Sequence, residues 1–473
     1  MTMVQTPAGG GTPGPAASPA APPPVSPAAS APVRRRSVPG GIRLITGVTV
    51  VSLALLFAAL AAGSSSAREG LRVIGRDAGP QVVATAGLYQ ALSDMDARVA
   101  DALVMGKDYP QQRQKAVKDY EKRRDEAGAA LLKAYELSLD DEAERTTVES
   151  ILNALGRYDM LAGQALKLDE KEGHPAGPPP QDVVQTYRQA TDLMRQVLLP
   201  QAYNLTLENG TIVRATYDEK AFMVPLWRAA VVVAGLVALG CLIWLQVFLA
   251  RRFRRVFGPA LVVATVMTVV ALGFGVHVLG QEEQALRTAK STGFDSVLTL
   301  AKARAISNSM QGDQSRALLD EERADTYKHT YFDKSLSLVF YDVGNLDEYH
   351  GRVTAGSKDF LGMLGPELVG SQGDAVFRAY QAFQTEDGTF RALVDEKRTN
   401  EAVAARIGPV TNAFTAYDES LQALARTHQQ ALARATAQGE GALGDLWRLL
   451  PYAIGAIGLL VIAGVWPRLK EYR

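Results

Sequence analysis

The sequence predicts an all-α membrane protein with four transmembrane helices and two extracytoplasmic antiparallel four-helix bundles, in which the second half duplicates the first. Three observations predict this fold class. Four uncharged apolar stretches are long enough to cross a bilayer, and basic residues gather at alternate ends of them. The two long segments between them lack the period-two alternation of strands. Strands are therefore not expected.

The four apolar stretches are residues 44–62, 229–250, 259–279 and 449–465, and none contains Asp, Glu, Lys or Arg. Each meets or approaches the length of about 20 residues that a membrane-spanning helix needs. Ion and proton pathways normally require charged groups inside the membrane, so a pump or secondary transporter is not expected. The small residues at 59–66 resemble a signal-peptide cleavage site, but the apolar run before them is longer than signal peptides have.

Basic residues set the predicted orientation. They precede the first stretch, fill the short connection between the second and third, and follow the fourth: Arg34, Arg35, Arg36, Arg43; Arg251, Arg252, Arg254, Arg255; Arg468, Lys470, Arg473. Positively charged ends face the cytoplasm. Both termini are therefore predicted to be cytoplasmic, in a multi-pass protein of the plasma membrane. The connection at 251–257 is also the expected contact for a cytoplasmic partner or for anionic lipid headgroups.

These boundaries divide the chain into nine segments. A Pro- and Ala-rich cytoplasmic tail that cannot bury a core covers 1–41 and is expected to be disordered. Transmembrane helices are predicted at 42–63, 224–250, 258–280 and 446–466, the Arg-rich turn at 251–257, and a short cytoplasmic tail at 467–473. The extracytoplasmic bundles are predicted at 64–223 and 281–445.

The duplication is predicted from short repeated sequences. Leu-Trp-Arg begins at Leu226 and again at Leu446, 220 positions later, and Thr-Val-Val begins at Thr49 and again at Thr268, 219 positions later. Trp227, Arg228, Trp447 and Arg448 are also the expected anchors at the membrane interface, so convergence on ordinary anchoring chemistry remains the alternative.

The extracytoplasmic segments show apolar residues at spacings of four and three, which is typical of a helical bundle. The helix that leads into each even-numbered span carries such a stripe, listed here for the two copies: Val183, Tyr187, Ala190, Met194, Val197; Val410, Phe414, Tyr417, Leu421, Leu424. In the first copy we expect breaks near 107–112 and 173–180. In the second copy we expect them near Gly312, at 344–351 and 365–373, and at Gly408-Pro409.

The residue inventory argues against several function classes. Fifty basic residues balance fifty acidic ones, which gives no attraction for nucleic acid. The only cysteine, Cys241, lies in a span, and the five histidines are scattered, so neither a zinc set nor another metal site is expected. His350 is interpreted as a solvated loop residue. No catalytic or cofactor-binding residue can be assigned, and a non-enzymatic protein is predicted.

With this topology the chain resembles the GlnX-type membrane proteins of actinobacteria over about residues 42–473. The resemblance rests on two span–helical domain–span units joined by the Arg-rich turn at 249–255. It implies a partner outside, a glutamine-binding-type lipoprotein, and a pathway inside that ends on protein kinase G in amino-acid sensing. The segments predicted to be cytoplasmic contain too few residues to form a catalytic output domain. This agrees with a transducer that needs a separate partner.

Three functions stay open from the sequence. The first is the transducer that this resemblance implies. The second is a direct small-ligand receptor with chemoreceptor-like helical bundles. The third is a structural scaffold in the membrane. Homo-oligomerisation also stays open.

Overall fold

The computed structural model describes residues 38–138, 141–253 and 258–470, with only the backbone placed at 38, 39, 252, 253, 468 and 469. The helices in the first half are α1 (Val38–Gly75), α2 (Ala78–Met105), α3 (Pro110–Leu137), α4 (Glu142–Glu172), α5 (Gln181–Leu193) and α6 (Leu199–Phe253). Those in the second half are α7 (Pro259–Thr288), α8 (Ser296–Leu319), α9 (Ala324–Leu338), α10 (Leu346–Thr354), α11 (Gly370–Asp395), α12 (Thr399–Ala405) and α13 (Thr411–Lys470).

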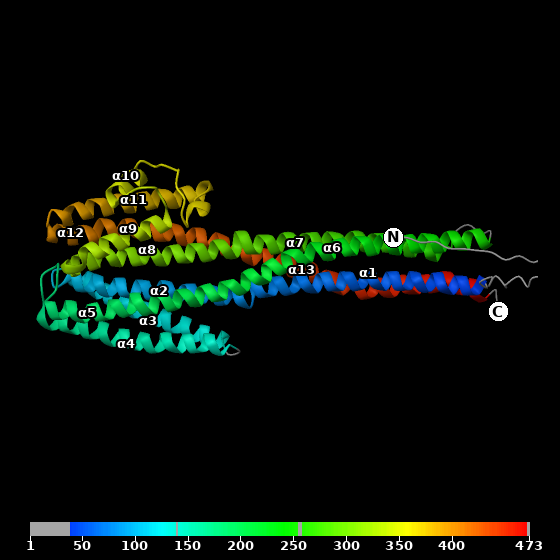
Figure 1. The fold of residues 1–473 in the computed structure, drawn as a ribbon, viewed down its shortest axis with the longest axis horizontal. Helices are drawn as coiled ribbons and strands as arrows, with labels where there is room; N and C mark the ends of the chain where they lie inside the picture. Colours follow the sequence, from blue (N-terminus) through cyan, green and yellow to red (C-terminus); the bar gives the residue numbers. More distant parts are fainter. Residues whose placement is uncertain (1–37, 139–140, 254–257, 471–473) are drawn as a thin grey trace, which may run out of the picture.

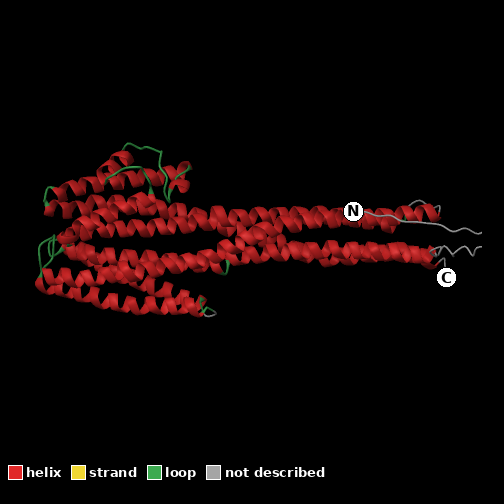
Figure 2. Cartoon of the chain, in the orientation of Figure 1, coloured by secondary structure: helices red, strands yellow, loops and turns green. Residues whose placement is uncertain are grey.

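Helices make up nearly all of the described chain, and no strand is present in it (Figure 2). Pairing of β type is limited to one isolated bridge between Phe340 and Leu361. The prediction of an all-α protein is confirmed.

The molecule is elongated, with a narrow end made by α1, α6, α7 and α13 and a wide end of two helical layers (Figure 1). One layer contains α2 to α5 and the beginning of α6, and the other contains α8 to α12 and the beginning of α13. Both ends of the described chain lie at the narrow end (Figure 1).

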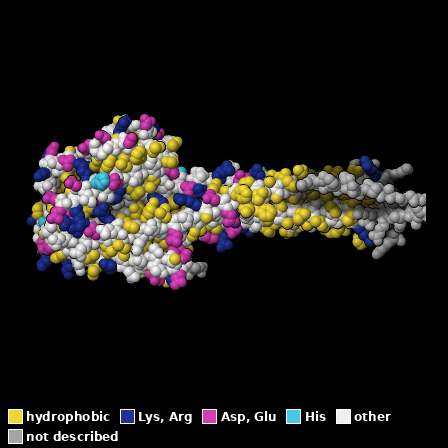
Figure 3. Space-filling model, in the orientation of Figure 1, with side chains coloured by type: hydrophobic (Ala, Val, Ile, Leu, Met, Phe, Trp, Pro, Cys, Tyr) yellow, Lys and Arg dark blue, Asp and Glu magenta, His cyan; other side chains and the backbone are white. Residues whose placement is uncertain are grey.

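The narrow end is suited to a bilayer. Four helices are long and apolar enough to cross a membrane, and each contains one of the predicted spans. Large apolar side chains such as Leu55, Val233, Val270 and Leu459 point outward and are more than half exposed. The same region is almost free of charged side chains at its surface (Figure 3). An exposed apolar band of this size is stable in contact with lipid rather than water, so the chain is a membrane protein.

Each long helix contains one irregular turn between the two ends. Arg76 and Asp77 interrupt α1 and α2, where a Cβ on Gly79 would lie 1.8 Å from the Ile74 carbonyl oxygen. Wide π-helical turns join the other pairs: Met194–Leu198 between α5 and α6, Ala289–Asp295 between α7 and α8, and Arg406–Val410 between α12 and α13. The first break expected in this half was near 107–112, so the interruption at Arg76 and Asp77 is a correction.

Two of the breaks predicted in the second half are wrong, for physical reasons. Gly312 lies inside α8, where a Cβ would approach Arg316 to 2.7 Å and Ala97 to 3.3 Å, so this glycine permits close packing rather than a turn. Gly408-Pro409 lies within the π-helical turn, whose altered hydrogen-bond ladder accommodates a proline. The chain leaves the helix instead at Asp320 and at Glu396–Arg398. The break predicted at 344–351 is displaced, because α10 occupies Leu346–Thr354 and the non-helical stretch is 339–345. In the first half the breaks after Met105 and at Gly173–Pro180 are as expected.

One apolar cluster runs through both layers of the wide end, from Leu88 and Tyr158 in the first layer to Tyr331 and Tyr417 in the second. A second cluster holds the four membrane-spanning segments together. A third, which includes Leu71, Leu286 and Leu443, joins them where the helices leave the spans. The two layers therefore share a core at the wide end, and movement of one layer must repack the other.

Candidate functional site: the polar interface between the layers

The feature that stands apart from this apolar packing is a buried polar interface between α2 and α8. The bonds Arg304–Gln90 and Ser315–Asp101 both join residues 214 positions apart, and Arg98–Gln311 joins residues 213 apart. A constant separation means that the two helices run in the same direction, side by side, from the narrow end toward the tip. Polar residues normally avoid such a position unless they are paired.

The centre of the interface is Asp96, which is fully buried on α2. Arg316 of α8 donates to its Oδ2 from Nη2 at 2.8 Å and from Nε at 3.2 Å. Tyr158 of α4 donates to Oδ1 at 3.1 Å, and Thr191 of α5 donates to Oδ2 at 2.7 Å. Helices α4, α5 and α8, which come from both layers, therefore all bind the carboxylate of Asp96 on α2.

Arg316 is 1% exposed and also pairs with Asp313 on its own helix. Burial alone would lower the pKa of this guanidinium, but the carboxylates of Asp96 and Asp313 outweigh burial and raise the pKa well above its usual value. Asp313 in turn accepts from Lys334 of α9, whose pKa burial lowers to about 8. Arg316 thus stays charged, and a chain of alternating charges crosses the interface.

A second buried carboxylate, Asp387 of α11, lies within the second layer. Arg391 donates to it from Nε at 2.9 Å, Gln314 from Nε2 at 2.6 Å, and the His350 Nε2 lies 3.0 Å away. Burial would raise the pKa of Asp387, but these partners hold it at about 2. The interpretation of His350 as a solvated loop residue is wrong, because it lies on α10 with its side chain 12% exposed.

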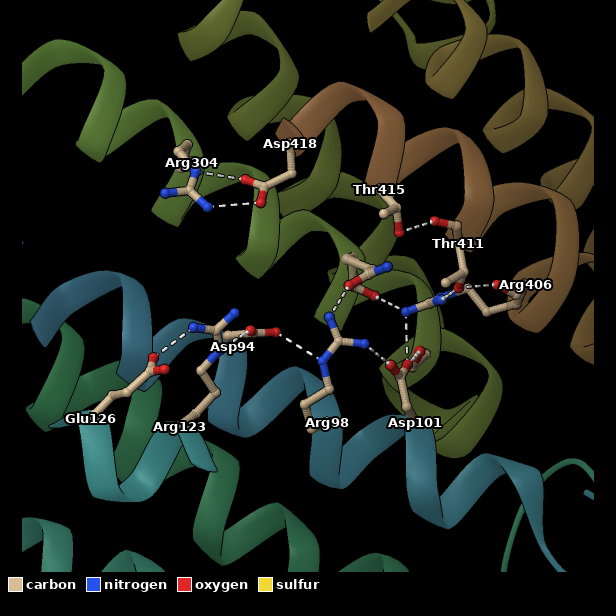
Figure 4. A network of polar contacts seen from close by, with 12 residues as sticks. Asp94, Arg98, Asp101, Arg123, Glu126, Arg304, Arg406, Thr411, Thr415 and Asp418 are labelled. Atoms are coloured by element: carbon tan, nitrogen blue, oxygen red, sulfur yellow. Dashed lines mark hydrogen bonds and ion pairs between the residues drawn. The ribbon is translucent and has the colours of Figure 1, made fainter. Parts of the chain in front are cut away.

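Toward the tip, Asp101 connects three helices (Figure 4). Arg406, from the π-helical turn before α13, donates to its Oδ1 from Nη2 at 2.7 Å, and Arg98 donates to its Oδ2 from Nη1 at 3.0 Å. The same Arg406 nitrogen donates to the Gln311 carbonyl oxygen at 3.0 Å. The irregular turn is thereby tied directly to the interface.

Closer to the membrane, two further arginines flank the space between the layers (Figure 4). Arg304 of α8 forms a bidentate pair with Asp418 of α13, at 2.7 and 2.8 Å. Arg123 of α3 pairs with Asp94 and Glu126, each at 2.6 Å. Burial would raise the pKa of Asp94, but Arg98 and Arg123 lower it. Charged residues therefore line the interface along much of the wide end.

A separate buried acid lies where the helices leave the spans. Glu282 of α7 is fully buried, and neither carboxylate oxygen has a hydrogen-bond partner among the described residues. It lies against α1 and α13, because a Cβ added to Gly439 would meet Leu71 at 2.3 Å and the Glu282 Oε2 at 2.9 Å. Burial raises the pKa of Glu282 to about 8, so this side chain is mostly protonated at neutral pH.

The residues that the sequence nominated lie elsewhere. Trp227 is half-buried against the apolar cluster of the spans, and Arg228 donates to Glu283 at 2.9 Å. Trp447 is 39% exposed, and Arg448 is exposed 3.9 Å from Asp445. Their role as interface anchors stays a prediction.

Of the Arg-rich turn, Arg251 is exposed, and only the backbone of Arg252 is placed. Arg254 and Arg255 lie outside the described residues, as do residues 1–37 of the tail with Arg34, Arg35 and Arg36. The proposed contact of this turn with a partner or with lipid therefore stays a prediction.

Sequence reasoning missed the polar interface because it considered only the apolar spacing of these helices. A signal is present, however: α2 carries Asp94 and Asp101 on one helix face and Asp96 on another, and residues 307–316 of α8 are polar except for Met310 and Gly312. A helix with polar residues all round is either solvated or paired with another polar helix. In the part of the chain that the structure describes, no group of three or more His, Cys, Asp or Glu could hold a metal ion.

Together, the apolar narrow end and the buried, ionised interface define a helical membrane protein with a built contact between two layers. Residues 70–218 match the model of a family described as an actinobacterial sensor domain. This segment covers the end of α1, helices α2 to α5 and the beginning of α6, which is the first layer. No curated protein and no solved structure matches the chain. The match supports an actinobacterial sensor protein with a role in sensing or signalling.

Replacing Arg316 with Met is expected to destabilise the protein strongly. The change leaves Asp96 and Asp313 buried without their main counter-charge, which costs about 3–5 kcal/mol in comparable buried pairs. Thermal unfolding of the detergent-purified protein measures the loss. The matched control is Arg398→Met, which removes the exposed pair with Glu401 and is expected to leave the melting temperature nearly unchanged. Equal losses in the two variants would contradict the assigned role of the interface.

Replacing Glu282 with Gln is expected to change how stability depends on pH. The pKa of Glu282 is raised in the folded protein, so between the ordinary value of 4.5 and about 8 only the unfolded chain releases the proton. Wild-type stability therefore falls across this range as pH rises. Glu282→Gln cannot ionise, so its melting temperature relative to wild type should increase steadily from pH 5 to pH 8 and then level off. A difference that is constant over this range would show that Glu282 is not a buried acid.

Proposed function

We propose that the chain is a transmembrane sensor in which an event at the wide end shifts one helical layer against the other, and the long helices carry that shift through the bilayer. The observation that carries this proposal is the continuity of the helices. Each of the four membrane-spanning segments belongs to a longer helical stretch that continues into the wide end. These stretches are Gly40–Met105, Gln181–Arg251, Pro259–Leu319 and Thr399–Pro467. A translation of one helix along its axis, or a rotation about that axis, can therefore be transmitted from the wide end to the narrow end.

The irregular turns are the proposed places where this displacement is adjusted. Wide π-helical turns are often found at functional positions, because they locally relax the helical hydrogen-bond register. One irregular turn interrupts each of the four helices, and Arg406 within one of them binds Asp101 across the interface. A change at the interface thus acts directly on a turn that leads into the fourth span.

We also propose that the two halves arose by duplication and that the wide end forms two extracytoplasmic bundles. The π-helical turns beginning at Met194 and Arg406 lie 212 positions apart. The interruption after Gly75 precedes the turn beginning at Ala289 by 214 positions. These separations are close to the 219 and 220 found between the repeated sequences of the spans. The basic residues at the narrow end support a cytoplasmic position for that end.

A non-enzymatic transducer with separate partners remains our preferred form of this function. The resemblance to GlnX-type proteins supports a solute-binding lipoprotein outside and a kinase pathway inside. Exposed apolar side chains at the side of the second layer, Leu361 at 72% and Val369 at 79%, offer a place where a protein partner could contact it. The direct small-ligand receptor is the second candidate, because a charged groove lies between the layers.

The relay is tested by substituting a residue at the wide end and measuring the distance between two membrane-spanning helices. In a Cys241→Ala background, spin labels at Leu226→Cys and Leu449→Cys report the distance between α6 and α13 at the membrane surface. A second pair at Lys107→Cys and Glu396→Cys reports the tip. Arg304→Gln removes the bidentate pair with Asp418, so it is expected to change both distance distributions. Lys133→Gln, at the exposed ion pair with Glu136 and away from all four labels, is the control and should change neither. A changed tip distance with an unchanged distance at the membrane would indicate an inert stalk.

The partner proposal is tested by purifying the tagged full-length protein from its host membrane with and without added amino acids. Recovery of a solute-binding lipoprotein is expected, and its recovery should decrease when Leu361 and Val369 are both replaced with Glu. The matched control is Leu132→Glu, an exposed apolar residue of the first layer. Recovery of cell-envelope enzymes without any such lipoprotein would favour the scaffold function instead.

A further inference from the structure

A groove of about 620 Å³ lies between the two layers on the membrane side of Asp96. Helices α2 and α3 of the first layer line one side of it, and Arg304 of α8 and Gln422 of α13 line the other. Ligand sites in proteins have volumes of roughly 300–1,000 Å³, so the groove is large enough for a small organic molecule.

Most of the polar atoms that remain unused in the groove are hydrogen-bond donors, and the exception is the Glu126 Oε1, which lies 3.9 Å from the Lys122 Nζ. Gln90 Oε1 accepts from Arg304 at 3.3 Å, and Gln422 Oε1 accepts from Arg426 at 2.7 Å, so both amides present their NH₂ groups. Arg123 uses Nε and Nη1 on Asp94 and Glu126, which leaves its Nη2 without a hydrogen bond to any described residue.

Lys122 adds a loosely held cation. Its side chain is 70% exposed, and its Nζ lies 3.9 Å from the nearest carboxylate, that of Glu126. The lining thus contains three cations, Lys122, Arg123 and Arg304, and one carboxylate, Glu126. A ligand that only accepts hydrogen bonds and carries negative charge would satisfy these groups.

The lining also contains small residues, including Ala84, Gly87, Ala91 and Ala129. A Cβ added to Gly87 would have no neighbour within 4 Å, so this position faces open space. The groove therefore leaves room for the body of a ligand whose charged group binds the donors.

We propose that this groove is a binding site for a small carboxylate-bearing molecule, which joins the donors of Lys122 and Arg123 in the first layer to Gln422 in the second. The inference deepens the sensor function proposed above and rests on it for its consequence. Binding would strengthen the contact between the layers, and it would do so beside α2, α8 and α13, each of which leads to a membrane span.

The experiment uses the full-length protein in detergent micelles, with acetate, succinate and citrate as probes. Thermal unfolding and calorimetric titration are compared with dimethyl succinate, which has no charge, and with sodium chloride at equal ionic strength. Gly87→Leu fills the groove. Gly156→Leu is the matched control, because this glycine is also exposed, also helical and also has nothing within 4 Å of an added Cβ. Both changes replace glycine with a better helix former, so neither should impair folding.

We expect at least one of the three carboxylates to raise the melting temperature saturably in the wild type and in Gly156→Leu, and to have no such effect in Gly87→Leu. Lys122→Gln should weaken binding about tenfold, the effect of losing one charge-assisted hydrogen bond. The proposal is overturned if none of the probes binds saturably, if sodium chloride gives the same response, or if Gly87→Leu binds as well as Gly156→Leu.

The failure of this inference is distinguishable from failure of the relay. A carboxylate that binds as expected but leaves the distance between labels at positions 226 and 449 unchanged would support the groove and contradict the relay. A relay that responds to Arg304→Gln in a protein that binds no carboxylate would contradict the groove alone.

Discussion

The ion pair between Asp96 and Arg316 is the interaction on which the arrangement of the wide end depends. Both side chains are almost completely removed from water, and a buried charge without a partner costs several kcal/mol. Asp96 has no basic partner among the described residues of its own layer, so the buried carboxylate of α2 needs the guanidinium of α8. The two layers must meet in one register, and the fixed separation of 213 to 214 positions along the neighbouring bonds reflects that register.

This requirement explains the small residues at the interface. Arg316 can reach Asp96 only if α2 and α8 lie close together, and Gly312 removes the Cβ that would otherwise meet both Arg316 and Ala97. Polar partners then come from further helices: Tyr158 and Thr191 complete the shell of Asp96, and Arg406 completes that of Asp101. A network with so many directional bonds has few alternative arrangements, which suits a contact that must change between defined states rather than continuously.

The segment that matches the actinobacterial sensor domain contains only one side of this network. Asp94, Asp96, Asp101 and Arg123 lie within residues 70–218, while Arg304, Arg316 and Arg406 lie outside it. Asp96 would lose Arg316, Asp101 would lose Arg406, and Gln90 would lose Arg304 if the second layer were absent. The packing of the matched segment therefore depends, in this chain, on a second helical layer that the match does not cover.

The sequence by itself determined the helical class and the positions of the apolar segments, because the length of an uncharged run and the absence of strand periodicity are local properties. It also placed the loop at Gly173–Pro180 correctly, since glycine and proline end helices wherever they occur together in such numbers. Local reasoning was wrong at Gly312 and His350, where the role of each residue depends on a distant partner. Only the tertiary structure brought Asp96 to Arg316, 220 positions away. It also buried the carboxylate of Glu282 without a hydrogen-bond partner among the residues that the structure describes. The physical reason is that the cost of burying a charge depends on what surrounds it, and those surroundings come from other parts of the chain.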